Sequence, residues 1–261
     1  MLTTTKLTLG RYELPLGMPL YLYFVVLVLL GLTYLPLFFS EPIVDAFARE
    51  DRIFESLSAV YLFLASAAFA LAYYRSRQPP HNNAHSLLKQ LSYLGLALFF
   101  FVAAGEEISW GQRILGIETP EAIKEINYQD ELTLHNLNAF QGEDSVLPVN
   151  LSQLFIAFGF AFGIGVPLVA LLFEPARRFF NSFMPIVPLA LGLFFAANYV
   201  YQKLILNFLR QFPDFYLHPT MPTAQGVYEI REHGYAFVFM LLAFYVGFVM
   251  LKSGKQEGSN A

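Results

Sequence analysis

Six long stretches of this chain contain no Asp, Glu, Lys or Arg, and they limit the possible folds more than any other feature. They are residues 14–40, 56–74, 90–105, 145–173, 179–202 and 234–251. A helix needs about 20 mostly apolar residues to cross the hydrocarbon core of a bilayer. A spanning segment must also satisfy its backbone hydrogen bonds internally, which a helix does. The pattern therefore predicts six transmembrane helices.

The overall composition agrees with a membrane protein. Of the 261 residues 56% are hydrophobic and 14% are charged, whereas a soluble domain carries about 25% charged residues. We interpret residues 1–252 as a single integral membrane domain, an all-α polytopic helical bundle, followed by a disordered cytoplasmic tail at 253–261. The expected spans are approximately 14–40, 53–74, 88–107, 148–173, 180–203 and 231–251, with an outer loop at 108–147.

The distribution of charge predicts the orientation in the membrane. Nine of the 16 Lys and Arg residues lie in the two terminal tails and in the short loops 75–89 and 174–178, whereas 17 of the 20 Asp and Glu residues lie on the opposite side. Basic residues concentrate in cytoplasmic loops, so both termini are expected in the cytoplasm. The acidic outer face argues against nucleic acid as a partner.

The third charge-free stretch holds only 16 residues between Lys89 and Glu106. Glu106 and Glu107 are therefore expected at the outer edge of the hydrocarbon or within it, and an ionisable group at that depth is a functional-site hypothesis. If the helix continued past Gly105 to Leu115, Glu106, Trp110 and Arg113 would share one face. The sequence leaves open which of these two ends the helix has.

Further polar residues cluster at the predicted outer ends of other segments. Glu229 and His233 are four residues apart on the last helix, and Glu131 and His135 have the same spacing in the outer loop. Carboxylate and imidazole groups together are typical ligands of zinc and similar metals. We therefore predict His135, Glu229 and His233 as ligands of a divalent metal such as zinc.

Simpler interpretations of the same residues stay open. Glu106 and Glu107 could form a structural ion pair with Arg113 that fixes the third helix. Glu229 could only be a favourable acid in the first turn of a helix. Glu131 and His135 could be solvated residues of the outer loop.

The outer loop is expected to contain a short amphipathic helix that starts at Thr119-Pro120-Glu121. Thr119 would be its N-cap residue and Pro120 would occupy the first turn. A second short helix is expected around 130–140, lying on the membrane surface.

One segment resembles a signature of uncharacterised bacterial multi-pass membrane proteins: Gly105-Glu106-Glu107-Ile108-Ser109-Trp110-Gly111-Gln112-Arg113. The resemblance covers about residues 50–140. It implies no particular activity. It implies a location in the inner membrane. The Glu-Glu pair followed by an arginine also has a partial likeness to intramembrane proteases of the CAAX-processing and bacteriocin-immunity family. Their arginine stands four residues after the second Glu, and here Arg113 stands six after Glu107.

The function that these observations favour is a membrane-embedded hydrolase. Its substrate would be a lipid or a membrane-bound peptide, and Glu106, Glu107 and Arg113 would be its catalytic residues, with Glu106 or Glu107 as a general base. One alternative is a non-enzymatic subunit or scaffold that binds other membrane proteins. Another is a small transporter or ion pathway.

Overall fold

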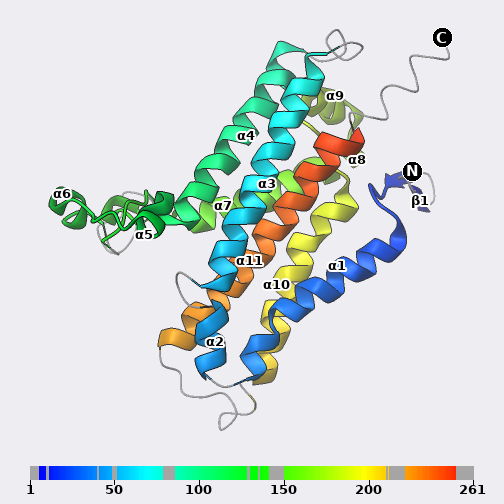
Figure 1. Ribbon diagram of the computed structural model, residues 1–261. Helices are drawn as coiled ribbons and strands as arrows, with labels where there is room; N and C mark the ends of the chain where they lie inside the picture. The colour runs from blue at the N-terminus through cyan, green and yellow to red at the C-terminus, as the bar shows by residue number, and fades with distance from the viewer. Residues whose placement is uncertain are drawn as a thin grey trace.

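The computed structural model describes residues 6–9, 12–39, 41–48, 52–78, 86–127, 130–134, 136–140, 150–209, 211 and 221–250. The described chain is mainly helical, with one small hairpin at the N-terminus (Figure 1). The hairpin pairs β1 (Lys6–Leu9) with β2 (Tyr12–Pro15) in antiparallel register. The longer helices are α1 (Leu20–Thr33), α2 (Glu41–Ala48), α3 (Ile53–Ser76), α4 (Leu87–Glu107), α7 (Leu151–Phe160), α8 (Val166–Leu172), α9 (Glu174–Phe183), α10 (Leu189–Leu209) and α11 (Met221–Phe244).

Short elements connect or extend these helices. Two π-helical segments, Ala161–Gly165 and Tyr245–Met250, continue α7 into α8 and extend α11. The remaining pieces are the 3-10 helices Leu35–Phe38, Ser109–Gly111 and Asn138–Phe140 and the four-residue helices α5 (Gln112–Leu115) and α6 (Glu121–Lys124).

Five helical segments of the described chain are long and apolar enough to cross a membrane. They are Pro42–Ser76, Leu87–Glu107, Leu151–Leu172, Leu189–Leu209 and Gly226–Met250. Large apolar side chains such as Phe24, Phe63, Leu98 and Leu204 are more than half exposed on the helix surfaces, where lipid would cover them. The protein is therefore an integral membrane protein with several spanning helices.

The first predicted span, 14–40, is not a single long helix. It contains the end of β2, the 14-residue α1 and a 3-10 turn. At 1.5 Å per residue α1 measures about 21 Å, which is shorter than the hydrocarbon core of about 30 Å. The predicted count of six spans is thus not confirmed.

The fifth predicted span, 180–203, is also placed differently. Residues 174–183 form the separate helix α9, and the long helix α10 begins only at Leu189. Pro185 and Pro188 lie between them, and proline interrupts a helix because it lacks an N–H donor and clashes with the preceding turn. The last helix differs as well, because α11 starts at Met221, ten residues before the predicted 231.

The outer loop contains less helix than predicted. Only Glu121–Lys124 forms the expected first helix, and Thr119 is not its N-cap, because Pro120 occupies that position without a side-chain bond. The described part of 130–140 contains the 3-10 turn Asn138–Phe140 and a bridge between Asn127 and Leu137, rather than an α-helix.

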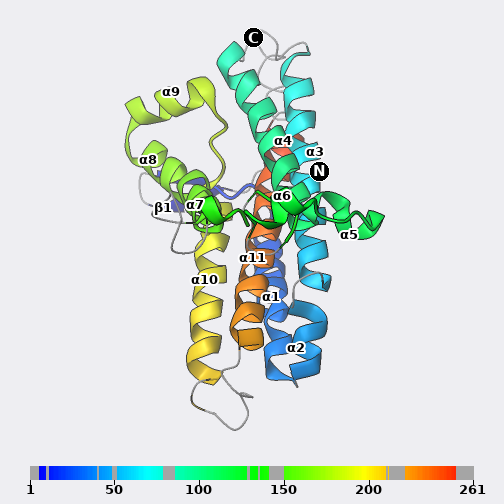
Figure 2. The ribbon, with the colours of Figure 1, turned by 90° about the vertical axis from the view of Figure 1, so that its left-hand side faces the viewer.

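The centre of the bundle is α3, which lies between α4 and α11 (Figures 1 and 2). Small buried side chains on the three helices allow this close approach, which is the usual basis of helix packing in membranes; they include Ala65, Ala68, Ala72, Ala97, Ala104, Ala236 and Ala243. The Ser66 hydroxyl also donates a hydrogen bond to the Ala97 carbonyl at 2.7 Å, joining α3 to α4.

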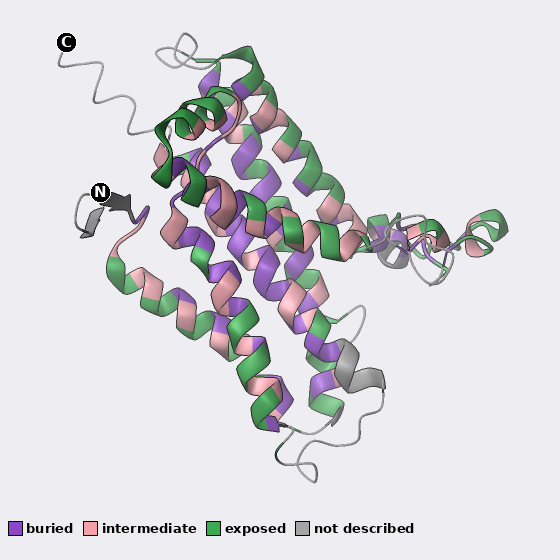
Figure 3. Ribbon diagram, turned by 180° about the vertical axis from the view of Figure 1, so that it is seen from behind, coloured by how far each residue is buried: buried purple, intermediate pink, exposed green. Residues whose placement is uncertain are grey.

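Aromatic rings fill the remaining interior. Phe100 of α4 stacks on Phe69 of α3, with ring centroids 5.6 Å apart, and its ring lies 5.0 Å from that of Phe239 in α11. The same Phe239 ring lies 4.9 Å from Phe195 of α10 and 4.8 Å from Phe155 of α7. The buried residues follow these inner faces along the helices (Figure 3). Phe239 is therefore the residue through which four helices meet.

The segment α7–π–α8 passes across the bundle rather than along it (Figure 3). It meets α10 at Gly163 and Gly192, where the backbones touch, because a methyl group on Gly192 would overlap the carbonyl oxygen of Gly163.

Replacing Gly192 with alanine is therefore expected to destabilise the protein. Overpacking of a close contact costs about 1–3 kcal/mol, so the midpoint of thermal unfolding in detergent should fall. Gly95→Ala in α4 is the matched control, since nothing lies within 4 Å of the added methyl group. Equal midpoints for the two variants would contradict the close crossing of α10 and the π-helical segment.

Candidate functional site

The carboxyl end of α4 carries two of the predicted site residues, Glu106 and Glu107. The helix ends at Glu107, and Ile108 is its C-cap residue. The chain then turns sharply, because Ser109, Trp110 and Gly111 all have positive φ values of 46°, 54° and 76°. Such backbone is strained for Ser and Trp and persists only when surrounding contacts hold it.

Glu106 supplies those contacts by accepting two hydrogen bonds. Trp110 Nε1 donates to Glu106 Oε1 at 2.7 Å, and the backbone N–H of Leu134 donates to Glu106 Oε2 at 2.6 Å. The Trp110 ring lies so close to Gly105 that a Cβ atom there would come within 2.8 Å of it. Both carboxylate oxygens of Glu106 are therefore used in holding Trp110 and Leu134 against the end of α4.

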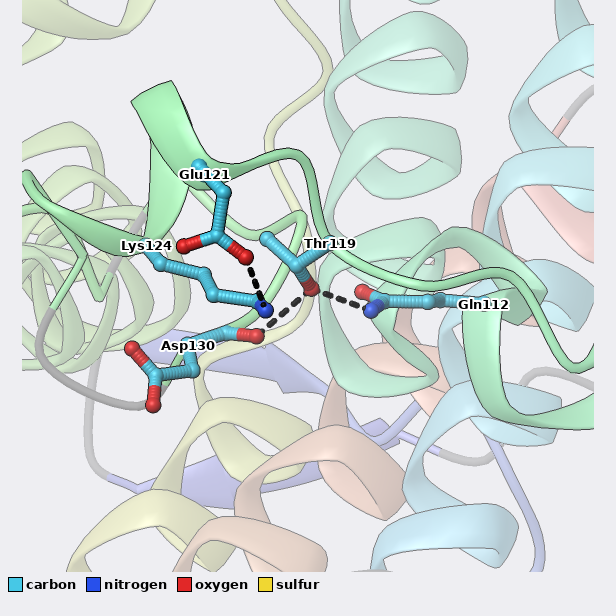
Figure 4. A network of polar contacts seen from close by, with 5 residues as sticks. All are labelled: Gln112, Thr119, Glu121, Lys124 and Asp130. Atoms are coloured by element: carbon cyan, nitrogen blue, oxygen red, sulfur yellow. Dashed lines mark hydrogen bonds and ion pairs between the residues drawn. The ribbon is translucent and has the colours of Figure 1, made fainter.

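Polar bonds inside the loop give it a defined shape (Figure 4). Thr119 Oγ1 accepts a hydrogen bond from Gln112 Nε2 and donates one to the Asp130 carbonyl at 2.6 Å. Glu131 is buried, and its carboxylate accepts a hydrogen bond from the Ser109 hydroxyl at 2.7 Å. On the exposed side of the loop, a hydrogen bond to Glu121 raises the pKa of Lys124.

Glu107 is half-buried, as is Glu106, but its main electrostatic neighbours lie on other helices. It interacts electrostatically with four other carboxylates, those of Glu232, Glu229, Glu55 and Glu106. Glu55 belongs to the first turn of α3, and Glu229 and Glu232 lie three residues apart on α11. We call these five residues the carboxylate cluster. Like charges this close repel unless a proton or a cation offsets them.

A cavity of about 450 Å³ opens beside this cluster between α4, α7 and α11. Its polar groups are Glu106, Glu107, Glu232, Ser152 and Tyr235. The rest of the wall is apolar and consists of Phe99, Val102, Ala103, Leu134, Leu151, Leu154, Phe155, Ile156, Phe158 and Ala236. The volume falls in the range of about 300–1,000 Å³ that small-molecule sites occupy.

His233 does not take part in this cavity. It is buried between the rings of Phe54 and Tyr61, at centroid distances of 4.7 and 5.2 Å. Its Nδ1 lies 3.2 Å from the Phe54 carbonyl oxygen and 3.4 Å from the Ser58 hydroxyl. These contacts join α11 to the start of α3, which is a packing role.

The predicted metal ligands are therefore not seen together. His135 lies outside the described residues, as does the side chain of Arg113, whose backbone is in α5. Glu229 belongs to the carboxylate cluster, whereas His233 binds the backbone of α3. Within the described ranges, no group of three His, Asp or Glu residues could hold a metal ion.

Glu232 is the site residue that sequence reasoning missed. It lies three residues after Glu229, and side chains at that spacing are neighbours on a helix surface, so the signal was present. Its Oε1 lies 3.7 Å from Arg231 Nη2. The sequence spacing instead groups Glu229 with His233. In the structure Glu232 lines the cavity beside α4, whereas His233 contacts α3.

No protein-family model, curated protein or solved structure shows a significant match to this chain.

The difference between the two adjacent glutamates can be tested with Glu106→Gln. A glutamine side chain has one acceptor oxygen, so it would leave one of the two donors, Trp110 Nε1 or Leu134 N, without its bond. Breaking a bond of this kind costs about 1–3 kcal/mol. The midpoint of thermal unfolding should fall, and the fluorescence of Trp110, the only tryptophan, should change as its ring leaves Gly105.

Glu121→Gln is the matched control, because it removes a carboxylate of the same loop whose only described ion pair, with Lys124, is exposed. This variant should keep the wild-type fluorescence and midpoint. If Glu106→Gln also left both unchanged, Glu106 would not be the residue that holds the loop.

Proposed function

We propose that the protein is a membrane-embedded hydrolase that acts on a lipid or a membrane-bound peptide. The observation that carries this proposal is that two carboxylates that interact electrostatically, Glu107 and Glu232, line a mostly apolar cavity. Paired carboxylates in environments that hold one proton between them can serve as an acid and a base. The apolar remainder of the wall suits an acyl chain or an apolar peptide side chain.

In the proposed reaction Glu232, whose ionised form is favoured by Arg231 at 3.7 Å, accepts a proton from a water molecule as the water oxygen attacks the substrate carbonyl carbon. Glu107, in its protonated form, donates a proton to the leaving nitrogen or oxygen as the bond between that atom and the carbon breaks. The products are a carboxylic acid and an amine or alcohol. Glu106 is a positioning residue in this account, because its oxygens hold Trp110 and Leu134.

The cavity wall supports entry of the substrate from the bilayer. Phe99 and Val102 of α4 and Leu154 of α7 line the cavity and are each about 40% exposed on the surface of the protein. All three belong to segments that are apolar enough to span a membrane. A lipid could therefore pass between α4 and α7 with its apolar part first and bring its polar part to Glu107.

The excess of negative charge around Glu107 also bears on the substrate. Four carboxylates besides its own contribute to the electrostatic surroundings of Glu107, and Arg231 Nη2 lies 3.7 Å from one of them, Glu232. A substrate with an amine or several N–H donors near its scissile bond would offset this charge. This supports amide-containing or amine-bearing amphiphiles as the first compounds to test.

The test is hydrolysis of a fluorogenic long-chain acyl amide and of the matching ester by the purified protein in lipid vesicles. Loss of general acid–base catalysis lowers a rate by about 10²–10⁴-fold, so Glu107→Gln and Glu232→Gln should each lose that much activity. Glu118→Gln, an exposed position in the loop, should keep it.

Two results would contradict the hydrolase. One is full activity in Glu107→Gln, which would assign the hydrolysis to another site or a contaminant. The other is a correctly folded wild type that cleaves neither compound while it purifies with other membrane proteins, which would support a non-enzymatic subunit instead.

We also propose that the chain crosses the inner membrane six times with both termini in the cytoplasm. Helix α1 and the following 3-10 turn of four residues together measure about 29 Å, close to the hydrocarbon thickness of about 30 Å. The distribution of Lys and Arg gives the orientation.

Reporter proteins fused to either end can check this topology. A fluorescent protein that matures only in the cytoplasm should fluoresce at both the N- and the C-terminus. With five crossings the two ends would lie on opposite sides, so fluorescence at one end alone would overturn the sixth crossing.

A further inference from the structure

Helix α9 (Glu174–Phe183) has one apolar and one polar face. Its apolar face, the α9 aromatic face, consists of Ala176, Phe179, Phe180 and Phe183, with ring centroids of the three phenylalanines 5.1–6.1 Å apart. The opposite face carries Glu174, Arg177, Arg178 and Asn181. A short helix of this kind is typical of segments that lie in the plane of a membrane surface.

The position of α9 in the chain supports the same location. A single residue, Phe173, separates it from the apolar segment Leu151–Leu172, and five residues separate it from Leu189, where the next apolar helix begins. A helix tied this closely to two membrane segments cannot lie far from the bilayer surface. Phe173 and Phe179 are about 60% exposed, so the aromatic face has an apolar surface for lipid to cover.

Contacts on the polar face fix α9 to the start of α4. Lys89 Nζ donates a hydrogen bond to Asn181 Oδ1 at 2.6 Å, and the Ser86 hydroxyl donates one to the Ser182 carbonyl. Ala176, Phe180 and Phe183 of the aromatic face are half-buried, and Phe179 is its exposed residue. The end of α4 with α9 is opposite to the end with Glu107, about 30 Å away along the 21-residue helix.

Two arginines lie on the polar face of α9. Arg177 and Arg178 pair with Glu174, and their side chains are 60% and 78% exposed. The hydrogen bond from Arg178 lowers the pKa of Glu174, which stays ionised at neutral pH and balances only one of the two positive charges. The exposed guanidinium groups therefore keep a net positive charge and free N–H donors, which suit a lipid phosphate.

We propose that α9 lies in the lipid–water interface and binds anionic phospholipid headgroups through Arg177 and Arg178. The aromatic face inserts among the upper acyl chains, and the arginines reach the phosphates beside it. This membrane contact is separate from the hydrolase proposal, because it involves none of the residues at the cavity.

The first test uses the absence of cysteine from the chain, which lets a single introduced cysteine carry a spin label. Phe179→Cys and Asn181→Cys place labels on the two faces of α9 in the full-length protein in lipid vesicles. The label at 179 should be relaxed by oxygen, which dissolves in lipid, and the label at 181 by a water-soluble nickel chelate. Relaxation of both by nickel, or protection of 179 from both reagents, would overturn the proposal, because the face would then contact water or protein.

The second test measures binding of fluorescent phosphatidylglycerol and phosphatidylcholine to the protein in mixed micelles. Each arginine near an anionic surface strengthens binding about fivefold, so the double variant Arg177→Gln/Arg178→Gln should bind phosphatidylglycerol about 25-fold more weakly. Phosphatidylcholine binding should not change. The control Arg52→Gln/Lys203→Gln removes two exposed cations elsewhere on the described chain and should bind like the wild type.

Excess glycerol phosphate distinguishes a lipid from a soluble phosphate ligand. It should displace little phosphatidylglycerol, since the aromatic face adds affinity only for a molecule in the bilayer. Full displacement, or equal loss of binding in the control variant, would show that the headgroup is not held at α9.

Discussion

The two hydrogen bonds that Glu106 accepts determine what the chain does after α4. Trp110 Nε1 and the Leu134 N–H bind the two oxygens of one carboxylate. These bonds offset the strain of the positive φ values at Ser109 and Trp110. They also bring Leu134 to the wall of the cavity. One side chain therefore ends the helix, directs the loop and completes the site.

Glu107 is the next residue, and its surroundings differ because a helix turns by 100° per residue. It faces α3 and α11, where Glu55, Glu229 and Glu232 lie. Small side chains such as Ala104 and Ala236 let these helices approach closely enough for the carboxylates to interact. The positions of the carboxylates at the end of α4 thus depend on how the alanines pack in the bundle.

The predictions made from sequence succeeded for features that depend on one segment of the chain alone. The lack of charge between Lys89 and Glu106 predicted a short membrane helix with two glutamates at its edge, and α4 does end at Glu107. They failed where contacts between segments decide the structure. Helix α1 begins only at Leu20, after the hairpin of β1 and β2, and Thr119 bonds to Gln112 and Asp130 rather than capping a helix. Glu232 was missed because the face of α11 that meets α4 depends on both helices.

The proposed function depends on a cavity that a molecule from the bilayer can enter, with its polar end at Glu107. The most direct measurement is photo-crosslinking in membranes with a fatty amide that carries a diazirine on its chain, followed by mass spectrometry of the labelled peptides. We expect labels on the cavity-wall residues Phe99, Leu154 and Phe158, and their loss in Ala103→Trp, which fills the cavity. Labels spread evenly over exposed residues of α1 and α10, and unchanged by Ala103→Trp, would contradict the account.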